Sequence, residues 1–189
     1  RGLGDVYKRQ VKENALNSCI QNKLKKIELS RFDIHTDLIG ENSECSFHGL
    51  YITDKNQHQE NEISTTHSVG RCSSDQMFKG ILAGKSRAVF SGKVLVKQDA
   101  QKTQAFQKDL NFLLSEEAEV DTKPSLEIYA DDVECSHGAT AGNMDKSMLF
   151  YLESRGINKD EAMSMLIKGF AQEIIDEFEA VSYTHLTLP

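Results

Sequence analysis

The sequence predicts a mainly β protein that ends in helices. Across residues 27–134, short stretches rich in aromatic and β-branched residues are separated by polar turns. Beyond Asp145 the apolar residues instead recur every three to four positions, which is the period of a helix. The predicted strands follow no strict sequence repeat. Their spacing is compatible equally with an irregular β-solenoid and with a sandwich.

Strand signals fall on five stretches: 27–29, 32–34, 46–53, 87–96 and 126–133. Turns are predicted at three polar stretches: 40–43, 54–61 and 116–123. Gly49 and Gly92 interrupt two of the strands, which predicts bulges or tight bends there.

The helical region divides in two. Residues 145–155 predict a short helix that stops at Gly156, because glycine adopts the left-handed conformation without a Cβ clash. Asn158 is a favourable N-cap for a second helix, and acidic residues follow in its first turn. The second helix carries one apolar stripe: Met163, Leu166, Ile167, Phe170, Ile174 and Phe178.

This stripe has two interpretations, which are packing on the chain's own sheet and docking to a partner. Four acids lie near the end of this helix: Glu173, Asp176, Glu177 and Glu179. They oppose the helix macrodipole, and no basic residue lies beside them in the sequence. We expect either that the helix continues further or that these acids meet a basic partner.

Composition excludes several classes of protein. The 189 residues include 22 Lys and Arg against 29 Asp and Glu, a net charge of -7 that is unlike a general nucleic-acid binder. No apolar run approaches the roughly 20 residues of a membrane helix. The four cysteines form no close pair: Cys19, Cys45, Cys72 and Cys135. No signal-peptide pattern is visible either, and both observations favour a reducing compartment such as bacterial cytoplasm.

Cys135 and His137 are the first candidates for chemistry. Two residues apart on an extended chain, they are expected to share a face. A thiolate and an imidazole both suit iron or zinc. From spacing alone, the commoner interpretation is a small core residue beside a hydrogen-bonded histidine.

Two other groups suggest different chemistry. A zinc-stabilised module would use two cysteines and two histidines: Cys45, His48, His67 and Cys72. Their spacing is not that of a known zinc finger. Asp131 and Asp132 form a carboxylate pair, as in sugar-cleaving β-solenoids. Adjacent strand residues point to opposite faces, however, so this pair cannot flank one bond.

Several motifs follow one another along the chain: FKGIL at 78–82, RAVFSGKV at 87–94, TKPSLEIYADDVECSHGAT at 122–140, MLFYLESRG at 148–156, Glu161-Ala162 and LIKGF at 166–170. In this order they resemble the SufB/SufD family of iron–sulfur cluster assembly proteins. The stretch 135–138 reads Cys-Ser-His-Gly where the SufB branch has Cys-Glu-His-Glu, and 103–115 lacks that branch's cysteine. The resemblance is therefore to the SufD branch.

The resemblance implies a fold with defined parts. It implies a truncated, right-handed, parallel β-helix (a single-stranded solenoid) over 11–144 and a C-terminal helical segment over 145–180. Residues 1–10 and 181–189 look like adapter-derived sequence, and we leave them out of the expected fold. Because the family's N-terminal domain and earlier rungs are absent, we expect the body alone to be marginally stable or aggregation-prone.

The resemblance also implies a role. It indicates a non-catalytic subunit of a SufBCD complex that pairs with a SufB-like subunit through the core and docks a SufC-like ABC ATPase through the helices. A homodimer is implied in isolation. No stably bound cofactor is implied, only a transient iron–sulfur cluster at the SufB–SufD interface, in the cytoplasm or in a plastid.

The same resemblance suggests site residues. His137 is implied at the interface as a transient metal ligand, with Cys135 beside it. The candidates for docking SufC are six apolar residues: Phe150, Tyr151, Met163, Leu166, Ile167 and Phe170. Two alternative functions are a SufB-like cluster scaffold and a β-solenoid carbohydrate-active enzyme.

Overall fold

The computed structural model describes the backbone of residues 5–11, 16–21 and 28–185, and the side chains of residues 28–176. The described elements are β1 (Asp5–Val11), β2 (Leu16–Gln21), β3 (Leu29–Leu38), β4 (Glu44–Thr53), β5 (His58–His67), β6 (Ser73–Leu82), β7 (Arg87–Val96), β8 (Thr103–Leu113), β9 (Glu119–Ile128), β10 (Val133–Asn143), α1 (Lys146–Ser154) and α2 (Lys159–His185).

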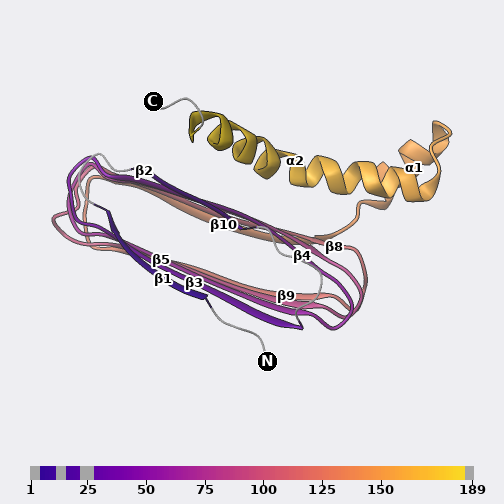
Figure 1. Cartoon of the computed structure of the whole chain (residues 1–189), viewed down its shortest axis with the longest axis horizontal. Coiled ribbons are helices and arrows are strands. Elements are labelled where there is room, and N and C mark those ends of the chain that lie inside the picture. Colours follow the sequence, from indigo (N-terminus) through magenta and orange to yellow (C-terminus); the bar gives the residue numbers. More distant parts are fainter. Residues whose placement is uncertain (1–4, 12–15, 22–27, 186–189) are drawn as a thin grey trace.

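The strands wind into a flattened parallel solenoid (Figure 1). Odd-numbered strands form one sheet in the order β1-β3-β5-β7-β9, and even-numbered strands form a second in the order β10-β8-β6-β4-β2. Leu29 lies beside His58 and His58 beside Arg87, so one turn takes about 30 residues. The parallel pairing confirms the predicted β-solenoid and excludes the antiparallel sandwich.

Several predicted boundaries are wrong. The predicted strand at 126–133 contains the end of β9, a corner at 129–132 and the first residue of β10. The predicted turns at 54–61 and 116–123 include the first residues of β5 and β9. The sequence did not predict β5, β6 or β8, because many of their inward side chains are polar, which hides the alternation that marks a strand.

The bulges predicted at Gly49 and Gly92 are also wrong, because both glycines lie in strands of unbroken register. Close packing is the reason for glycine at these positions. A Cβ on Gly49 would lie 2.5 Å from the Phe78 ring, and one on Gly92 would lie 2.2 Å from the amide nitrogen of Gln107. Each glycine therefore leaves room for a side chain that crosses the interior.

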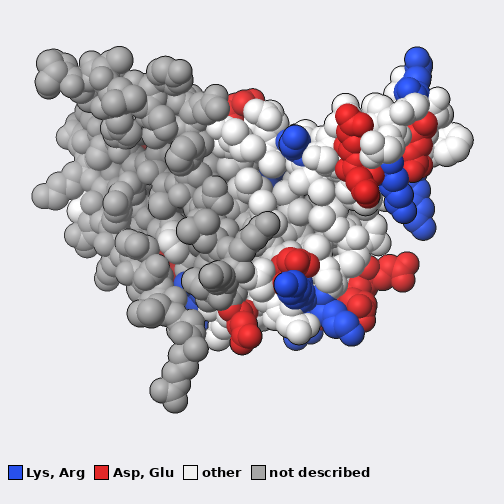
Figure 2. Space-filling model, turned by 45° about the vertical axis from the view of Figure 1, so that its right-hand side comes forward, with Lys and Arg blue, Asp and Glu red and all other residues white. Residues whose placement is uncertain are grey.

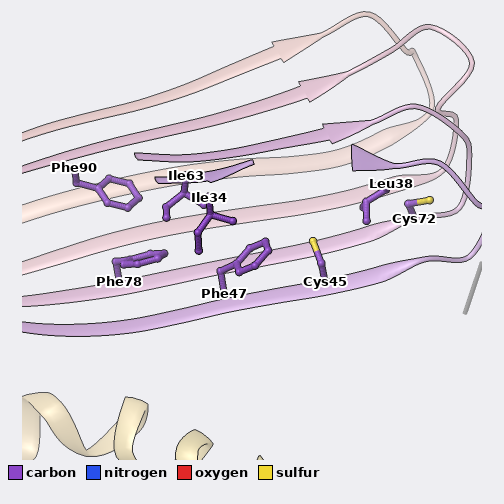
Figure 3. Close-up of a cluster of buried hydrophobic side chains, with 8 residues drawn as sticks. All are labelled: Ile34, Leu38, Cys45, Phe47, Ile63, Cys72, Phe78 and Phe90. Carbon is purple, nitrogen blue, oxygen red and sulfur yellow. The ribbon is translucent and has the colours of Figure 1, made fainter. Parts of the chain in front are cut away.

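An apolar cluster fills one part of the space between the sheets (Figure 3): Ile34, Leu38, Cys45, Phe47, Ile63, Cys72, Phe78 and Phe90. The ring centroids of Phe78 and Phe90 are 5.1 Å apart. Because these side chains come from successive turns, their burial ties each turn to the next.

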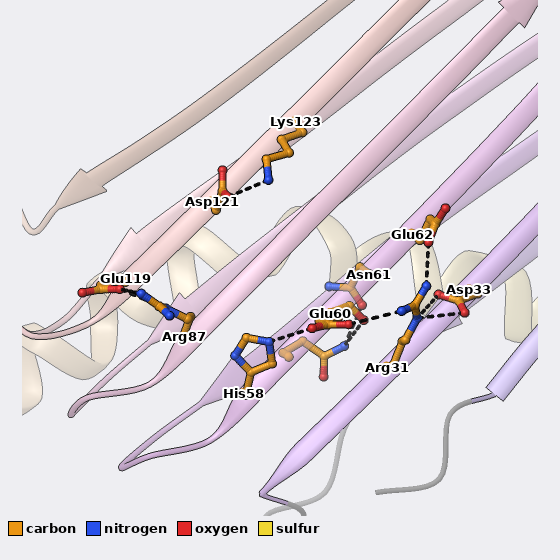
Figure 4. Close-up of polar contacts among 11 residues, drawn as sticks. Arg31, Asp33, His58, Glu60, Asn61, Glu62, Arg87, Glu119, Asp121 and Lys123 are labelled. Atoms are coloured by element: carbon orange, nitrogen blue, oxygen red, sulfur yellow. Dashed lines mark hydrogen bonds and ion pairs between the residues drawn. The ribbon is translucent and has the colours of Figure 1, made fainter.

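The outer face of the odd-numbered sheet is charged (Figure 4). Arg31 in β3 lies 2.9 Å from Asp33 and 2.8 Å from Glu62 of β5, and Arg87 in β7 pairs with Glu119 of β9. These ion pairs run along the ladder of parallel strands. Because these ion pairs are exposed, each contributes little to stability, and this face is a solvated surface.

Both predicted helices are present. The Asp145 carboxylate accepts from the Ser147 amide at 2.8 Å to cap α1, and Gly156 follows α1 with a φ of 86°. Asn158 accepts from the Glu161 amide at 2.9 Å at the start of α2. Neither described helix combines the length and apolarity needed to cross a membrane.

Helix α2 lies along the outer face of the even-numbered sheet (Figure 1). Ala171 and Ile174 are buried there against Leu50 and Ile81, which confirms packing on the chain's own sheet for this part of the stripe. The side chain of Phe178 lies outside the described residues.

Both expectations for the acids of α2 find support, because the helix continues to His185 and Glu173 has a basic partner within the same chain. The Glu173 carboxylate lies 2.7 Å from the ammonium of Lys79, which β6 supplies from the sheet below. The basic partner comes from elsewhere in the same chain, about 90 residues earlier, so no local pattern could reveal it.

Candidate functional site

One end of the solenoid is open. Within the described residues, β10 is hydrogen-bonded to β8 alone and β9 to β7 alone, so each is the last strand of its sheet. Most side chains of β10 are exposed. An open edge presents unpaired backbone N–H and C=O groups that another chain can pair with.

Strand β10 carries the predicted pair at this open end. Cys135 lies beside Ala105 of β8, and His137 lies beside Gln107. Ala105 and Gln107 are both buried, and neighbours in parallel register point to the same side of a sheet. The predicted shared face is therefore confirmed, and it is the face that continues the solenoid interior.

The two side chains differ in environment. Cys135 is half-buried and packs beside Val133 and Leu126 in a small apolar cluster, whereas His137 is exposed. Desolvation raises the pKa of the Cys135 thiol. A thiol held neutral is a poor nucleophile and a poor ligand, so His137 is the better donor of the two.

A polar interior lies behind β10. The Gln107 amide nitrogen donates to Gln76 at 2.7 Å, and the Gln76 amide nitrogen donates to Thr65 at 2.9 Å. Asn111 donates to Asp109 at 2.8 Å, and desolvation raises the pKa of Asp109 to about 6. The sequence did not predict this interior, although polar residues at alternate positions of β8 are the signal that could have indicated it.

Two glycines lie in open space on the opposite face of β10. A Cβ added to Gly138 or Gly142 would meet nothing within 4 Å, so internal packing explains neither glycine. Ala139 and Ala141 alternate with them. Glycine inside a strand often marks a site where another backbone approaches closely.

The zinc alternative is wrong. Cys45 and Cys72 are buried in the apolar cluster, His67 bonds Ser74 at 2.8 Å, and His48 pairs with Asp75 at 2.7 Å. Among the described residues, no group of three or more His, Cys, Asp or Glu side chains is arranged to hold a metal ion.

The carboxylate pair does not form an enzymatic cleft. Asp131 and Asp132 are exposed at the corner between β9 and β10, and Asp132 lies 3.2 Å from the ammonium of Lys102. No described feature supports glycoside cleavage by this pair, because both carboxylates lie on the surface.

The six predicted docking residues divide into three groups. Phe150 and Tyr151 of α1 are 71% and 55% exposed, and α1 buries no residue. Ile167 and Phe170 pack towards the sheet, where Phe170 also meets Phe112 at 5.4 Å between ring centroids. Met163 is half-buried, and Leu166 lines a pocket.

That pocket measures about 400 Å³ and lies between α1, α2 and β8. Eight residues line it: Phe112, Asn143, Asp145, Met148, Met165, Leu166, Gly169 and Phe170. Acidic and basic side chains lie side by side on the described part of the face in Figure 2. The candidate surface of the helices is therefore defined by exposed apolar side chains and not by charge of one sign.

Comparison with known proteins agrees with the resemblance. The family described as "SUF system FeS cluster assembly, SufBD core domain" matches residues 7–170. Iron-sulfur cluster assembly protein SufD of Escherichia coli is 46% identical over 146 residues, which cover 77% of this chain and 34% of that protein.

Two further relatives come from photosynthetic organisms. A SufBD family protein of Synechocystis is 40% identical and covered to 34% of its length, and the chloroplastic protein ABCI7 of Arabidopsis thaliana is 36% identical and covered to 32%. Of this chain, 82% and 80% are matched. The chain thus spans about a third of these relatives, and it belongs to the SufBD family of iron–sulfur cluster assembly proteins as a SufD-like member.

Proposed function

We propose that this chain acts as a non-catalytic subunit of a SUF assembly complex, pairing with a SufB-like subunit through the open end of the solenoid. The observation that carries the proposal is the open edge of β10, with His137 on its inward face and two glycines in open space on the other face. A second parallel or antiparallel strand can continue the backbone ladder there.

The chemistry of the site suits a shared cargo. An imidazole can hold iron while a partner supplies thiolates. In this proposal His137 is a transient ligand of an iron–sulfur cluster under construction, and Cys135 packs beside it. The cluster is the substrate of the complex, and the chain holds no cofactor permanently.

The helices form the second part of the proposal. The exposed aromatic side chains of α1 and the neighbouring pocket dock a SufC-like ABC ATPase. Because the last described strand, β10, ends at Asn143 and α1 begins at Lys146, movement of the docked ATPase would pull directly on the open end. The relatives from Escherichia coli and from a chloroplast support a bacterial cytoplasm or a plastid as the compartment.

Copurification with a SufB-like subunit tests the pairing. Gly138→Lys places a long charged side chain on the face of β10 opposite His137, where the chain itself offers space. We expect at least a tenfold loss of capture with an unchanged melting temperature. Ser64→Lys on the outer face of β5 is the matched control. Full capture by Gly138→Lys would contradict pairing through β10.

Capture of a SufC-like ATPase tests the helical surface. Phe150→Asp removes an aromatic side chain that is 71% exposed, so the fold should be unaffected while capture falls at least tenfold. Tyr129→Asp, which changes an aromatic side chain 64% exposed at a solenoid corner, is the control. Equal capture by both variants would place the ATPase elsewhere.

A further inference from the structure

We propose that Gln107 is a positioning residue for His137. In this proposal the ring of His137 turns inward, and the side-chain oxygen of Gln107, which has no partner in the structure, accepts a hydrogen bond from one ring nitrogen. That bond fixes which nitrogen stays free to face the partner. This inference rests on the proposed role of His137 at the open end, and it concerns how the ring is presented there.

Register places the two side chains together. His137 of β10 is the parallel-sheet neighbour of Gln107 of β8, and both lie on the inward face. Neighbouring strands are about 4.8 Å apart, which brings the ends of two long side chains within reach of one another. Since β10 is the last described strand of its sheet, it is the element that covers this side of Gln107.

Gln107 has one unmet hydrogen bond. Gln107 is 1% exposed, and its side-chain nitrogen donates to Gln76. Its side-chain oxygen is buried and has no hydrogen-bond partner. A buried acceptor left unpaired is destabilising, because it has lost its hydrogen bonds to water and gained none in the protein. The ring N–H of His137 is the donor that the register brings beside it.

The rest of the interior holds Gln107 in place. Gln76 is itself fixed by its bond to Thr65 on the opposite sheet, and the absent side chain at Gly92 makes room for the Gln107 amide. The acceptor therefore belongs to a rigid network and can orient a ring that is otherwise exposed. A loosely held side chain could not.

The chemical consequence concerns the imidazole tautomer. A neutral imidazole has one donor nitrogen and one acceptor nitrogen. When an amide oxygen holds the N–H, the lone pair is confined to the other nitrogen, as in the outer-shell partners of metal-bound histidines. Gln107 would thus aim the lone pair of His137 away from the core and towards the partner.

Nitrogen-15 NMR of the imidazole tests this inference in the full chain. At a pH where the ring is neutral, the wild type should show one dominant tautomer of His137. Gln107→Met removes the acceptor at nearly constant volume. It should shift the ratio of the two tautomers by about fivefold, the factor expected for one net hydrogen bond.

Two variants control the measurement. Gln107→Glu keeps an acceptor oxygen and should retain the wild-type tautomer. Gln104→Met makes the same change on the other face of β8, where Gln104 lies 3.2 Å from Glu134, and should have no effect on the ring. An unchanged ratio in a folded Gln107→Met variant would overturn the inference.

A measurement on the wild type keeps the test independent of variant folding. The ring protons of His137 should show nuclear Overhauser contacts to the Gln107 side chain, and their absence would equally overturn it. Both readouts need no partner, so failed capture of a SufB-like subunit would leave them unchanged. In the complex, Gln107→Met should lower cluster yield without lowering capture.

Discussion

Asp109 and His67 are titratable side chains that are fully buried inside the solenoid. Burial shifts the pKa values of both, and the two shifts make stability depend on pH in opposite ways. Desolvation raises the pKa of Asp109 from 3.8 to about 6 and lowers that of His67 from 6.5 to about 4. Each shift favours the neutral form in the folded chain.

The two shifts have opposite pH dependence. The folded state binds the Asp109 proton more tightly than the unfolded state, so this group lowers stability as pH rises from 3.8 to about 6. The folded state resists protonation of His67, so this group lowers stability as pH falls from 6.5 to about 4. Between pH 4 and 6 the two effects offset each other.

Single substitutions should separate them. For Asp109→Asn, we expect the free energy of unfolding to fall by up to about 3 kcal/mol, relative to wild type, as pH is lowered from 6.5 to 4. For His67→Gln it should rise by a similar amount over that range. Urea denaturation at several pH values measures both, and parallel profiles for the two variants would contradict the assignment.

Glycine positions offer a second test at the residue scale. A Cβ on Gly80 would lie 2.5 Å from the ring of Tyr51, which is buried and hydrogen-bonded to Asn111 and so cannot move aside. Gly80→Ala should cost about 1–3 kcal/mol. Gly138→Ala, which meets nothing within 4 Å, should stay within about 0.5 kcal/mol in thermal or chemical unfolding. Equal costs would show that the interior yields.

At the scale of the element, one lysine fixes α2 on the sheet. Lys79 of β6 is 5% exposed, donates to the Phe170 carbonyl oxygen at 2.8 Å and lies 2.7 Å from the Glu173 carboxylate. Its ammonium also lies 5.0 Å from the Phe170 ring centroid. One buried cation therefore satisfies several groups of the same helix.

Lys79→Met should loosen this helix. The change removes the hydrogen bond to the Phe170 carbonyl oxygen and the contact with the Phe170 ring, while the exposed Glu173 carboxylate returns to water. We therefore expect faster hydrogen exchange in α2 and a loss of about 1 kcal/mol in unfolding free energy. Lys85→Met, which removes an exposed ion pair to Glu117, is the control and should change little. Unchanged exchange in α2 would mean that apolar packing alone holds the helix.

At the scale of the whole molecule, each strand that the structure describes pairs only with strands one turn away. Stability is then close to a sum of turn and neighbour terms, and a terminal turn has one neighbour fewer. The expectation that the body alone is marginally stable or aggregation-prone stays a prediction, and a sharp, reversible thermal transition would contradict it.

Hydrogen exchange should follow this one-dimensional order. Amide groups of β10 should exchange at least tenfold faster than those of β6, which has β4 and β8 on its two sides. Binding of a SufB-like subunit should slow exchange in β10 and leave β6 unchanged. Protection that appears in α1 instead of β10 would show that this partner uses the helices.

The sequence determined the local features of this protein. Several predicted features depend on residues near one another in the chain: the strands at 46–53 and 87–96, the cap at Asn158, the stop at Gly156 and the family motifs. The shared face of Cys135 and His137 followed from the alternation of a strand.

Only the tertiary structure decided the rest. Turns about 30 residues apart place Gln107 beside His137, and packing of α2 on the sheet places Lys79 beneath Glu173. No local periodicity records such pairs. Polar residues such as Gln76 and Asp109 are typical of a surface in the sequence, yet both are buried: Gln76 bonds Thr65 of the facing sheet, and desolvation raises the pKa of Asp109. Which strand keeps an open edge is likewise a property of the assembled solenoid, because an edge is defined only when the other strands have paired.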